Sequence, residues 1–531
     1  MPGERLRRAT SIMLALGLLA SCSTRALPTP TPAPLPTPSA SPTVAATRTT
    51  PAAIPRFDTS VCPFALPAGE VPGTTVDCGY LIVPERRDAL QGPTVRLAVA
   101  RFRALDGNVD GGPWVYVAGG WGNPVQGLVS HTTGSFRSEA TTHHDFILYD
   151  QRGVGLSQPS LACPELGDAV FAAYQQPASA GSGVPPPVAA AAHCRDRLVQ
   201  QGIDLTAYTS VEDAADLNDL RVVLGYRQLN LSGISYGTVR ALTVLRDFPD
   251  AVRSVVLDAT APLQANLITD WGGDFDRALR LLFARCAAES RCHSTYPTLE
   301  SDFSQVVTQL NAAPASITIT DPTSGQRYPL VITGARLVSL TFDGLYTVRT
   351  LATLPATIAQ LKQGNDAQLT QLAGTAVLSA RATQTAREFA ILCSESIPYA
   401  REDEAIGRLD QVLPVERDTS LAFIQTIFAI CAYWPVKLPS ARAHQPVTST
   451  TPALVLQSAN DPVTPPTYGQ EAAKTLSKSF YVETPGVGHG VWTNDSGDCV
   501  LPLMLRFMDD PARQPDTSCT AGLGFFFQTS Y

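Results

Sequence analysis

The stretch Leu231-Ser232-Gly233-Ile234-Ser235-Tyr236-Gly237 lies between an apolar run and a segment with helical character. Its G-x-S-x-G pattern predicts a sharp strand-to-helix turn, at which the serine has a strained backbone and an exposed hydroxyl. The small flanking residues let the backbone bend tightly there. Glycine and serine are also common in ordinary loops, so the pattern identifies a catalytic serine only if other residues can activate it.

Two later segments supply the residues that would activate the serine. A serine hydroxyl is a poor nucleophile and needs a histidine base, which in turn needs a carboxylate. Asp461 and His489 each follow a short apolar run, at the predicted carboxyl end of a strand, where open α/β sheets place their sites. We therefore predict the catalytic triad Ser235, Asp461 and His489. Asp258, at the end of the strand after the elbow helix, is the competing acid, and Asp461 could instead be a turn residue before proline.

The oxyanion formed in acyl transfer also needs hydrogen-bond donors. One predicted donor is the backbone N–H of Tyr236, the residue after the serine. The other is expected in the loop after an early strand, which here reads Val117-Ala118-Gly119-Gly120-Trp121-Gly122. Gly120 is the preferred donor and Trp121 the alternative, while a plain glycine turn without a catalytic role is the competing interpretation.

Strand-like and helix-like segments alternate through much of the chain. Short apolar runs typical of buried parallel strands occur at residues 95–102, 114–117, 146–149, 229–232, 254–257, 453–457 and 479–483. Between them, Thr209 and Glu212 have the spacing of a helix capping box, and Gly225 is expected to end that helix. The alternation predicts an α/β fold with a doubly wound, mostly parallel sheet.

Helical periodicity replaces this alternation in the middle of the chain. We predict that residues 57–262 form the first part of the catalytic core, 263–440 an inserted helical cap, and 441–531 the rest of the core.

The N-terminal residues resemble an export signal. Three arginines precede an apolar run at residues 12–20 that is too short to span a bilayer, and Leu19-Ala20-Ser21-Cys22 resembles a bacterial lipobox. We expect residues 1–21 to be removed and Cys22 to be lipidated, which would place the protein on the extracytoplasmic face of a bacterial membrane. Ordinary secretory cleavage nearby is the alternative. Residues 22–56, rich in Pro, Thr and Ala, are expected to form an extended tether.

The charge balance excludes some partners. Without residues 1–21, Lys plus Arg falls from 39 to 36 and Asp plus Glu from 47 to 46, so the net charge is near −10. Nucleic acids and anionic lipid surfaces reward basic patches, so we expect no nucleic-acid partner. The membrane contact is expected through the lipid alone.

Setting Cys22 aside leaves ten cysteines, which in an oxidising compartment can pair completely. They lie in neighbouring couples, and we expect local disulfides Cys62 with Cys78, Cys163 with Cys194, Cys286 with Cys292, Cys393 with Cys431, and Cys499 with Cys519. A zinc site at Cys286, Cys292 and His293 lacks paired C-x-x-C spacing. We predict no metal and no cofactor.

Four blocks of sequence together resemble the prolyl- and tripeptidyl-aminopeptidase family of α/β-hydrolase serine peptidases. They are the glycine loop at 119–122, Tyr149-Asp150-Gln151-Arg152-Gly153-Val154-Gly155-Leu156-Ser157, the elbow at 233–237, and the Asp461 and His489 segments. The likeness extends from about Val61 to the C-terminus, and the region around Cys499 looks like the tripeptidyl-aminopeptidase-like extension. In the family the second block shapes the floor of the active site, which implies structural roles for Asp150 and Arg152.

The resemblance also implies a substrate class. Aminopeptidases of this family hold the free ammonium of the substrate with carboxylates of the cap, which makes Glu395 a candidate; a solvated helix-end glutamate is the competing interpretation. The family loop often reads H-G-G-P-G, whereas Ala118 and Trp121 stand at the histidine and proline positions here. These departures affect the oxyanion assignment and the surface that faces the substrate, and Trp121 is a candidate substrate contact.

These features together predict an exported serine exopeptidase that releases N-terminal amino acids or short peptides through an acyl-enzyme on Ser235. A carboxylesterase or lipase with the same triad is the alternative, and a peptide-binding lipoprotein without activity is a third hypothesis. The sequence does not indicate an oligomeric state.

Overall fold

The computed structural model describes residues 53–107, 111–120, 124–177, 185–495 and 497–529. Cys22, the predicted signal segment and Trp121 therefore lie outside the described residues. None of the described helices is long and apolar enough to span a membrane.

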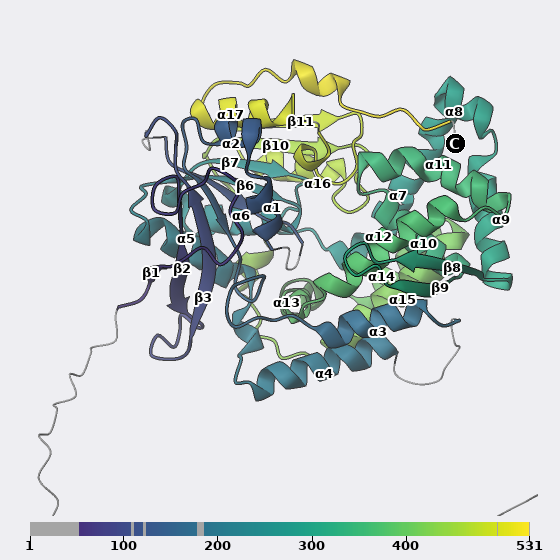
Figure 1. Ribbon diagram of the computed structural model, residues 1–531, viewed down its shortest axis with the longest axis horizontal. Helices are drawn as coiled ribbons and strands as arrows, with labels where there is room; N and C mark the ends of the chain where they lie inside the picture. The colour runs from purple at the N-terminus through teal and green to yellow at the C-terminus, as the bar shows by residue number, and fades with distance from the viewer. Residues whose placement is uncertain (1–52, 108–110, 121–123, 178–184, 496, 530–531) are drawn as a thin grey trace, which may run out of the picture. The chain divides into compact units, whose positions relative to one another are not determined.

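A nine-stranded sheet organises the fold (Figure 1). Its strand order is β1-β2-β3-β5-β4-β6-β7-β10-β11. The strands are β1 (Arg56–Thr59), β2 (Val76–Pro84), β3 (Thr94–Phe102), β4 (Trp114–Val117), β5 (Phe146–Tyr149), β6 (Leu229–Ile234), β7 (Val252–Asp258), β10 (Ala453–Ser458) and β11 (Ser479–Thr484). In the sheet order from β5 through β4, β6, β7 and β10 to β11, neighbouring strands run parallel. This confirms the predicted mostly parallel sheet.

The run that begins at Val95 differs from its prediction as a parallel strand. It belongs to β3, which pairs antiparallel with both β2 and β5. The short connection from Pro84 to Thr94 permits only an antiparallel pair. Because most of β3 is buried, its apolar run does not reveal the direction of pairing.

Helices cover both faces of the sheet. The helices of this part of the chain are α1 (Gln126–His131), α2 (Gly134–Ala140), α3 (Pro164–Tyr174), α4 (Pro186–Gln200), α5 (Ser210–Val223), α6 (Tyr236–Asp247), α16 (Pro466–Thr475) and α17 (Val500–Asp509). Along β7, Val255 belongs to the apolar cluster that includes residues of α5 and α6, whereas Val256 belongs to the cluster that includes residues of α1, α2 and α17. This alternation gives the sheet two apolar faces. As predicted, the Thr209 side chain caps α5 by accepting the N–H of Glu212.

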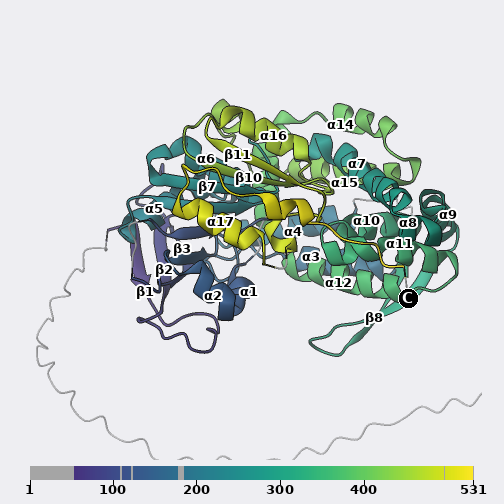
Figure 2. The same cartoon turned by 90° about the horizontal axis from the view of Figure 1, so that it is seen from above.

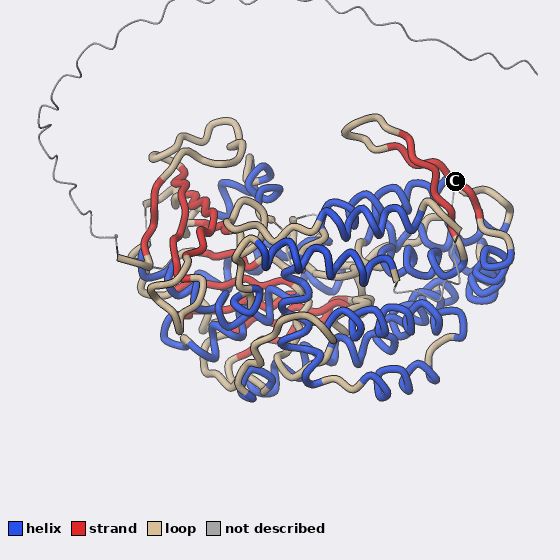
Figure 3. The backbone as a smooth tube through the Cα atoms, turned by 90° about the horizontal axis from the view of Figure 1, so that it is seen from below, coloured by secondary structure: helices blue, strands red, loops and turns tan. Residues whose placement is uncertain are grey.

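Between β7 and β10 the chain leaves the sheet and forms a second group of helices (Figure 2). They are α7 (Leu267–Ala288), α8 (Ser290–Thr295), α9 (Leu299–Ala312), α10 (Gly334–Gly344), α11 (Val348–Lys362), α12 (Ala367–Thr383), α13 (Ala386–Ile391), α14 (Glu402–Arg408) and α15 (Pro414–Cys431). We refer to residues 263–440 as the cap. The cap also contains a hairpin, β8 (Ala315–Thr320) with β9 (Arg327–Ile332), which stands apart from the main sheet in Figure 3.

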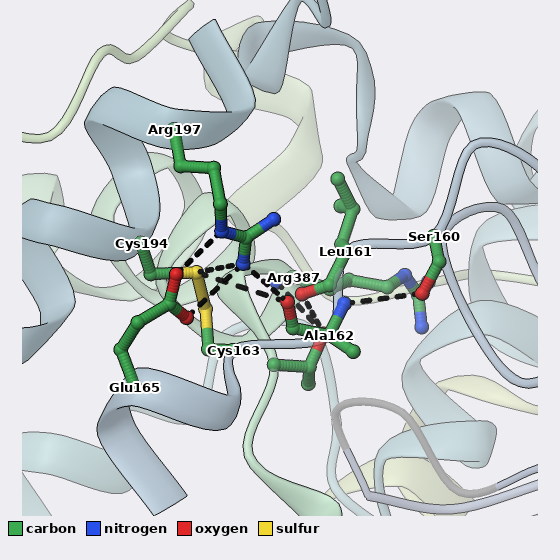
Figure 4. Close-up of a disulfide and its surroundings, with 9 residues drawn as sticks. Ser160, Leu161, Ala162, Cys163, Glu165, Cys194, Arg197 and Arg387 are labelled. Atoms are coloured by element: carbon green, nitrogen blue, oxygen red, sulfur yellow. Dashed lines mark hydrogen bonds and ion pairs between the residues drawn. A yellow bond between two sulfur atoms is a disulfide. The ribbon is translucent and has the colours of Figure 1, made fainter. Parts of the chain in front are cut away.

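The structure pairs the ten cysteines as the five neighbouring couples. Five disulfides are typical of an oxidising, extracytoplasmic compartment. Figure 4 shows the bond between Cys163, the residue before α3, and Cys194 of α4. Beside it, the Arg197 guanidinium binds the Glu165 carboxylate and donates to the carbonyl oxygen of Ala162 at 2.9 Å. The α3–α4 pair is thereby held together and packs against α12 and α15 of the cap.

Candidate active site

Ser235 lies at the corner between β6 and α6. Its backbone has φ 56° and ψ −128°, a strained conformation for a residue with a side chain and the one expected at a nucleophile elbow. A Cβ atom at Gly237 would lie 2.1 Å from the carbonyl oxygen of Val117 on β4. Only glycine at that position therefore lets α6 begin so close to the sheet.

Asp461 and His489 meet at the carboxyl ends of β10 and β11. The His489 Nδ1 atom lies 2.9 Å from each carboxylate oxygen of Asp461. The carboxylate is fully buried and also accepts the backbone N–H groups of Val463 and Thr464, at 2.9 and 2.8 Å. Burial lowers the pKa of His489, but the charge and hydrogen bond of Asp461 outweigh it, so the pKa is raised above the ordinary 6.5. The carboxylate thus stabilises the imidazolium.

Asp258, the competing acid, has different partners. Its two carboxylate oxygens accept the backbone N–H groups of Val491 and Trp492, at 2.7 and 2.9 Å. Burial raises the pKa of Asp258 to about 6. Asp258 therefore holds the turn that follows His489, while Asp461 contacts the imidazole itself.

The glycine loop after β4 lies beside the elbow. A Cβ atom at Gly119 would lie 2.7 Å from the carbonyl oxygen of Ile234 and 3.1 Å from the Ser235 Cβ, so the loop backbone approaches the serine closely. The buried Arg240 guanidinium of α6 donates to the carbonyl oxygens of Ala118 and Gly120, both at 2.7 Å. These bonds fix the loop that carries the predicted oxyanion donor.

A cavity of about 560 Å³ opens above Ser235 between the sheet and the cap. Ser235, Tyr236, Gly120 and His489 all line it. Most of its other lining is apolar or aromatic, including Tyr116, Leu128, Trp271, Tyr346, Leu392 and Phe423.

Glu388 of α13 is the one acidic residue among the described residues that line this cavity. It is half-buried, and burial raises the pKa of its carboxyl to about 7. Sequence reasoning missed this residue. The available signal was its place seven residues before Glu395, which on a regular α-helix would put both carboxylates on one face.

The structure corrects the assignment of Glu395 as a contact for the substrate. Its carboxylate accepts the backbone N–H of Ser210 at 2.6 Å and the Tyr236 hydroxyl at 2.7 Å, and it lines a separate cavity of about 40 Å³. After α13 the helix continues as a π-helical turn, Leu392–Ser396. The wider turn rotates Glu395 away from the face of Glu388. Glu395 is partly exposed and lies outside the lining of the main cavity, and it caps the start of α5.

Asp150 and Arg152, expected to be structural, are both buried. The Asp150 carboxylate accepts the N–H groups of Val125 and Leu156, both at 2.8 Å. Arg152 forms an ion pair with buried Asp216 at 2.8 Å. Asp150 therefore holds two loop segments and Arg152 is bound to α5, and both residues lie outside the lining of the cavity.

Comparison with known proteins supports the same fold. A family model for the alpha/beta hydrolase fold matches residues 118–492, well over half of the chain. The chain belongs to the alpha/beta hydrolase fold family. This match confirms the predicted fold and the prediction of an enzyme of the hydrolase class.

Proteins similar to this chain in sequence carry different names. The chain is 25% identical to serine protease Hip1 of Mycobacterium tuberculosis over 459 residues, which cover 79% of this chain and 82% of that protein. It is 31% identical to tripeptidyl aminopeptidase of Streptomyces lividans over 189 residues, 35% of each chain. It is also 25% identical to carboxylesterase B of Mycobacterium tuberculosis over 539 residues, 96% of this chain and 98% of that one.

Proposed function

We propose that this alpha/beta hydrolase is a serine exopeptidase that releases N-terminal amino acids or short peptides. The observation that carries the proposal is the single carboxylate of Glu388 in an otherwise largely apolar cavity, above Ser235 and the bonded pair of Asp461 and His489. The relatives named serine protease and tripeptidyl aminopeptidase support the same chemistry.

In the proposed reaction, His489 takes the proton of the Ser235 hydroxyl as Oγ attacks the carbonyl carbon of the scissile bond. The negative charge that develops on the carbonyl oxygen is stabilised by the backbone N–H groups of Tyr236 and Gly120. His489 then gives its proton to the leaving amine, and the peptide bond breaks to leave an acyl-enzyme. Water, deprotonated by His489, hydrolyses this ester and frees Ser235. Asp461 stabilises the imidazolium in both halves.

Glu388 supplies the proposed selectivity for a free N-terminus. A carboxylate in an apolar cavity is costly to ionise without a partner, which fits its raised pKa of about 7. A substrate ammonium would provide that partner and favour the ionised form. An ester without an amino group would leave Glu388 unpaired and gain nothing from it.

The experiment that tests the reaction is acylation of Ser235. A fluorophosphonate probe should label the wild-type protein at Ser235, and Ser235→Ala should abolish both labelling and hydrolysis of aminoacyl or tripeptidyl chromogenic substrates. Undiminished turnover by Ser235→Ala would overturn the assignment of the nucleophile.

A carboxylesterase is the second candidate, favoured by the predominantly apolar lining of the cavity and by the length of the match to carboxylesterase B. Acetylating the amino group of a substrate separates the two. An esterase should hydrolyse esters without an amino group as fast as it hydrolyses free aminoacyl esters.

For location, we propose an exported lipoprotein with its lipid on Cys22 and residues 22–56 as a tether. Two or more acyl chains would hold such a protein stably at a membrane. Cys22→Ala should move the protein from the membrane fraction to the soluble fraction and abolish incorporation of radiolabelled palmitate. Unchanged membrane association would contradict the anchor.

A further inference from the structure

Two segments of the cap bind the backbone of the loops that carry Asp461 and His489. From α7, Arg277 donates through Nη1 to the carbonyl oxygen of Ala459 at 2.7 Å and through Nη2 to that of Asp461. From the connection between α10 and α11, the Tyr346 carbonyl accepts the His489 N–H at 2.8 Å. The acid and the base of the triad are therefore both held from the cap, on the main chain.

In the part of the chain that the structure describes, Arg277 binds the loop of Asp461 without an ion pair of its own. It is half-buried, and within the described residues no acidic side chain lies within ion-pair distance of it. Its Nε has no hydrogen-bond partner in the described structure. Burying a guanidinium without an ion pair is costly. The two loop carbonyls and the more distant charges of Asp274 and Asp461 offset part of this cost.

The positions of these two carbonyl groups matter because the loop that connects β10 to Asp461 is short. Asp461 follows β10 by only three residues, and its carboxylate is aligned by the turn that places Val463 and Thr464 on Oδ1. Arg277 binds the backbone carbonyl of Asp461, the residue whose side chain must contact His489. A misplacement of about 1 Å at a reacting group can cost on the order of a hundredfold in rate.

We propose that Arg277 is a positioning residue for the triad, which acts from the cap by fixing the main chain of Asp461. The proposal rests on the function proposed above, because it takes Asp461 and His489 as the working acid and base. The cap then completes the catalytic apparatus in addition to covering the cavity.

The test replaces Arg277 by glutamine, which keeps a polar side chain but cannot donate to both carbonyls. Arg277→Gln should lower kcat at least about tenfold while KM changes less than about twofold, since Arg277 does not line the cavity. The acid limb of the kcat profile should also move to lower pH, because a looser contact with Asp461 raises the pKa of His489 less. Arg277→Lys should restore part of kcat.

Arg280→Gln is the matched control, because Arg280 lies on the same helix and, among the described residues, forms its ion pair with Asp276 and makes no contact with the loop of Asp461. It should leave kcat, KM and the pH profile unchanged. A folded Arg277→Gln protein with the kcat and acid limb of the wild type would overturn the proposal. Loss of cooperative unfolding in Arg277→Gln would assign Arg277 to the fold and would overturn it as well.

Labelling by a fluorophosphonate separates this inference from the proposed function. The probe reports the activation of Ser235 whether the natural substrate is a peptide or an ester. Failure of the wild type to label would refute the proposed function itself. Labelling of Arg277→Gln at the wild-type rate, with the wild type active, would refute the positioning role alone.

Discussion

At the scale of single residues, the site depends on carboxylates that differ in their partners. Asp461 meets the imidazole of His489, Asp258 binds the turn that follows it, and Glu388 stands in the cavity. The positions of Asp461 and Asp258 at strand ends were predictable from the sequence. The sequence also predicted Asp461 as the partner of His489, and the structure places the two in contact. It did not predict that Asp258 binds the turn after His489, because that contact depends on how two loops fold back over the sheet.

Replacing the two competing acids should have different consequences. Asp461→Asn should lower kcat by about 10³ to 10⁴, as loss of the triad carboxylate does in serine proteases. Asp258→Asn keeps one carbonyl oxygen that can accept an N–H group of the turn, so kcat should fall about tenfold or less. Steady-state kinetics of both variants decide the matter: a larger loss in Asp258→Asn would make Asp258 the working acid.

The pH dependence of kcat/KM should report both His489 and Glu388. Hydrolysis needs neutral His489, whose pKa is raised, and ionised Glu388, whose pKa is about 7 in the empty cavity. The rate on a free-amine substrate should therefore climb as pH rises through about 7, with a slope of log(kcat/KM) approaching two. In Glu388→Gln one ionisation is gone, so the slope should approach one. Equal slopes in the two proteins would show that Glu388 takes no part in binding.

At the scale of elements, the sequence predicted the strands of the parallel part closely because continuous apolar runs mark them. It missed β1, β2 and the hairpin of β8 and β9. Burial alternates along β8, and β1 and β9 are partly exposed; in the mostly buried β2, Asp77 and Gly79 interrupt the apolar run. It also missed the π-helical turn Leu392–Ser396, which no residue pattern marks. That turn decides which glutamate faces the cavity, so the pocket was less predictable than the triad.

Helix α15 carries a fully buried carboxyl group. Glu416 is completely buried, and neither of its carboxylate oxygens has a hydrogen-bond partner in the described structure. Burial raises its pKa from 4.5 to about 8. A raised carboxyl pKa lowers the free energy of unfolding as pH rises from about 4.5 to 8, because over this range the unfolded state releases the proton while the folded state still holds it.

Between pH 5 and pH 8 this group should lower the free energy of unfolding by ~3 kcal/mol. Glu416→Gln should remove that pH-dependent loss, whereas Glu404→Gln, at an exposed ion pair of α14, should keep it. Denaturant titrations at both pH values measure the difference. If the free energy of unfolding of Glu416→Gln fell between the two pH values as much as that of the wild type, the raised pKa of Glu416 would not be the cause.

The Cys393–Cys431 disulfide joins two walls of the cavity, one carrying Glu388 and Leu392 and the other Phe423. It closes a loop of 38 residues, so replacing both cysteines by serine should lower the free energy of unfolding by about 4 kcal/mol. KM for a free-amine substrate should rise more than kcat falls. Removing Cys499–Cys519, which lies outside the cavity lining, should lower stability without raising KM.

At the scale of the whole folded unit, residues 53–529, the sheet carries the proposed nucleophile Ser235 and the cap carries Glu388, the residue proposed to select the substrate. The interruption of the strand pattern after β7 predicted an insertion. It did not predict that α3 and α4, from the first part of the chain, pack against α12 and α15 of the cap, because such contacts depend on tertiary packing. Elbow, acid and histidine belong to elements with clear local signals, whereas the substrate-facing wall is assembled from distant segments.

The proposed exopeptidase activity is tested most directly by one comparison of kcat/KM. Matched aminoacyl or tripeptidyl amides, with the N-terminus free or acetylated, are hydrolysed by the wild type and by Glu388→Gln. The wild type should prefer the free amine by at least about tenfold, and Glu388→Gln should lose most of that preference while its rate on the acetylated substrate stays within about twofold. Equal rates of the wild type on both substrates would contradict the account and favour an esterase.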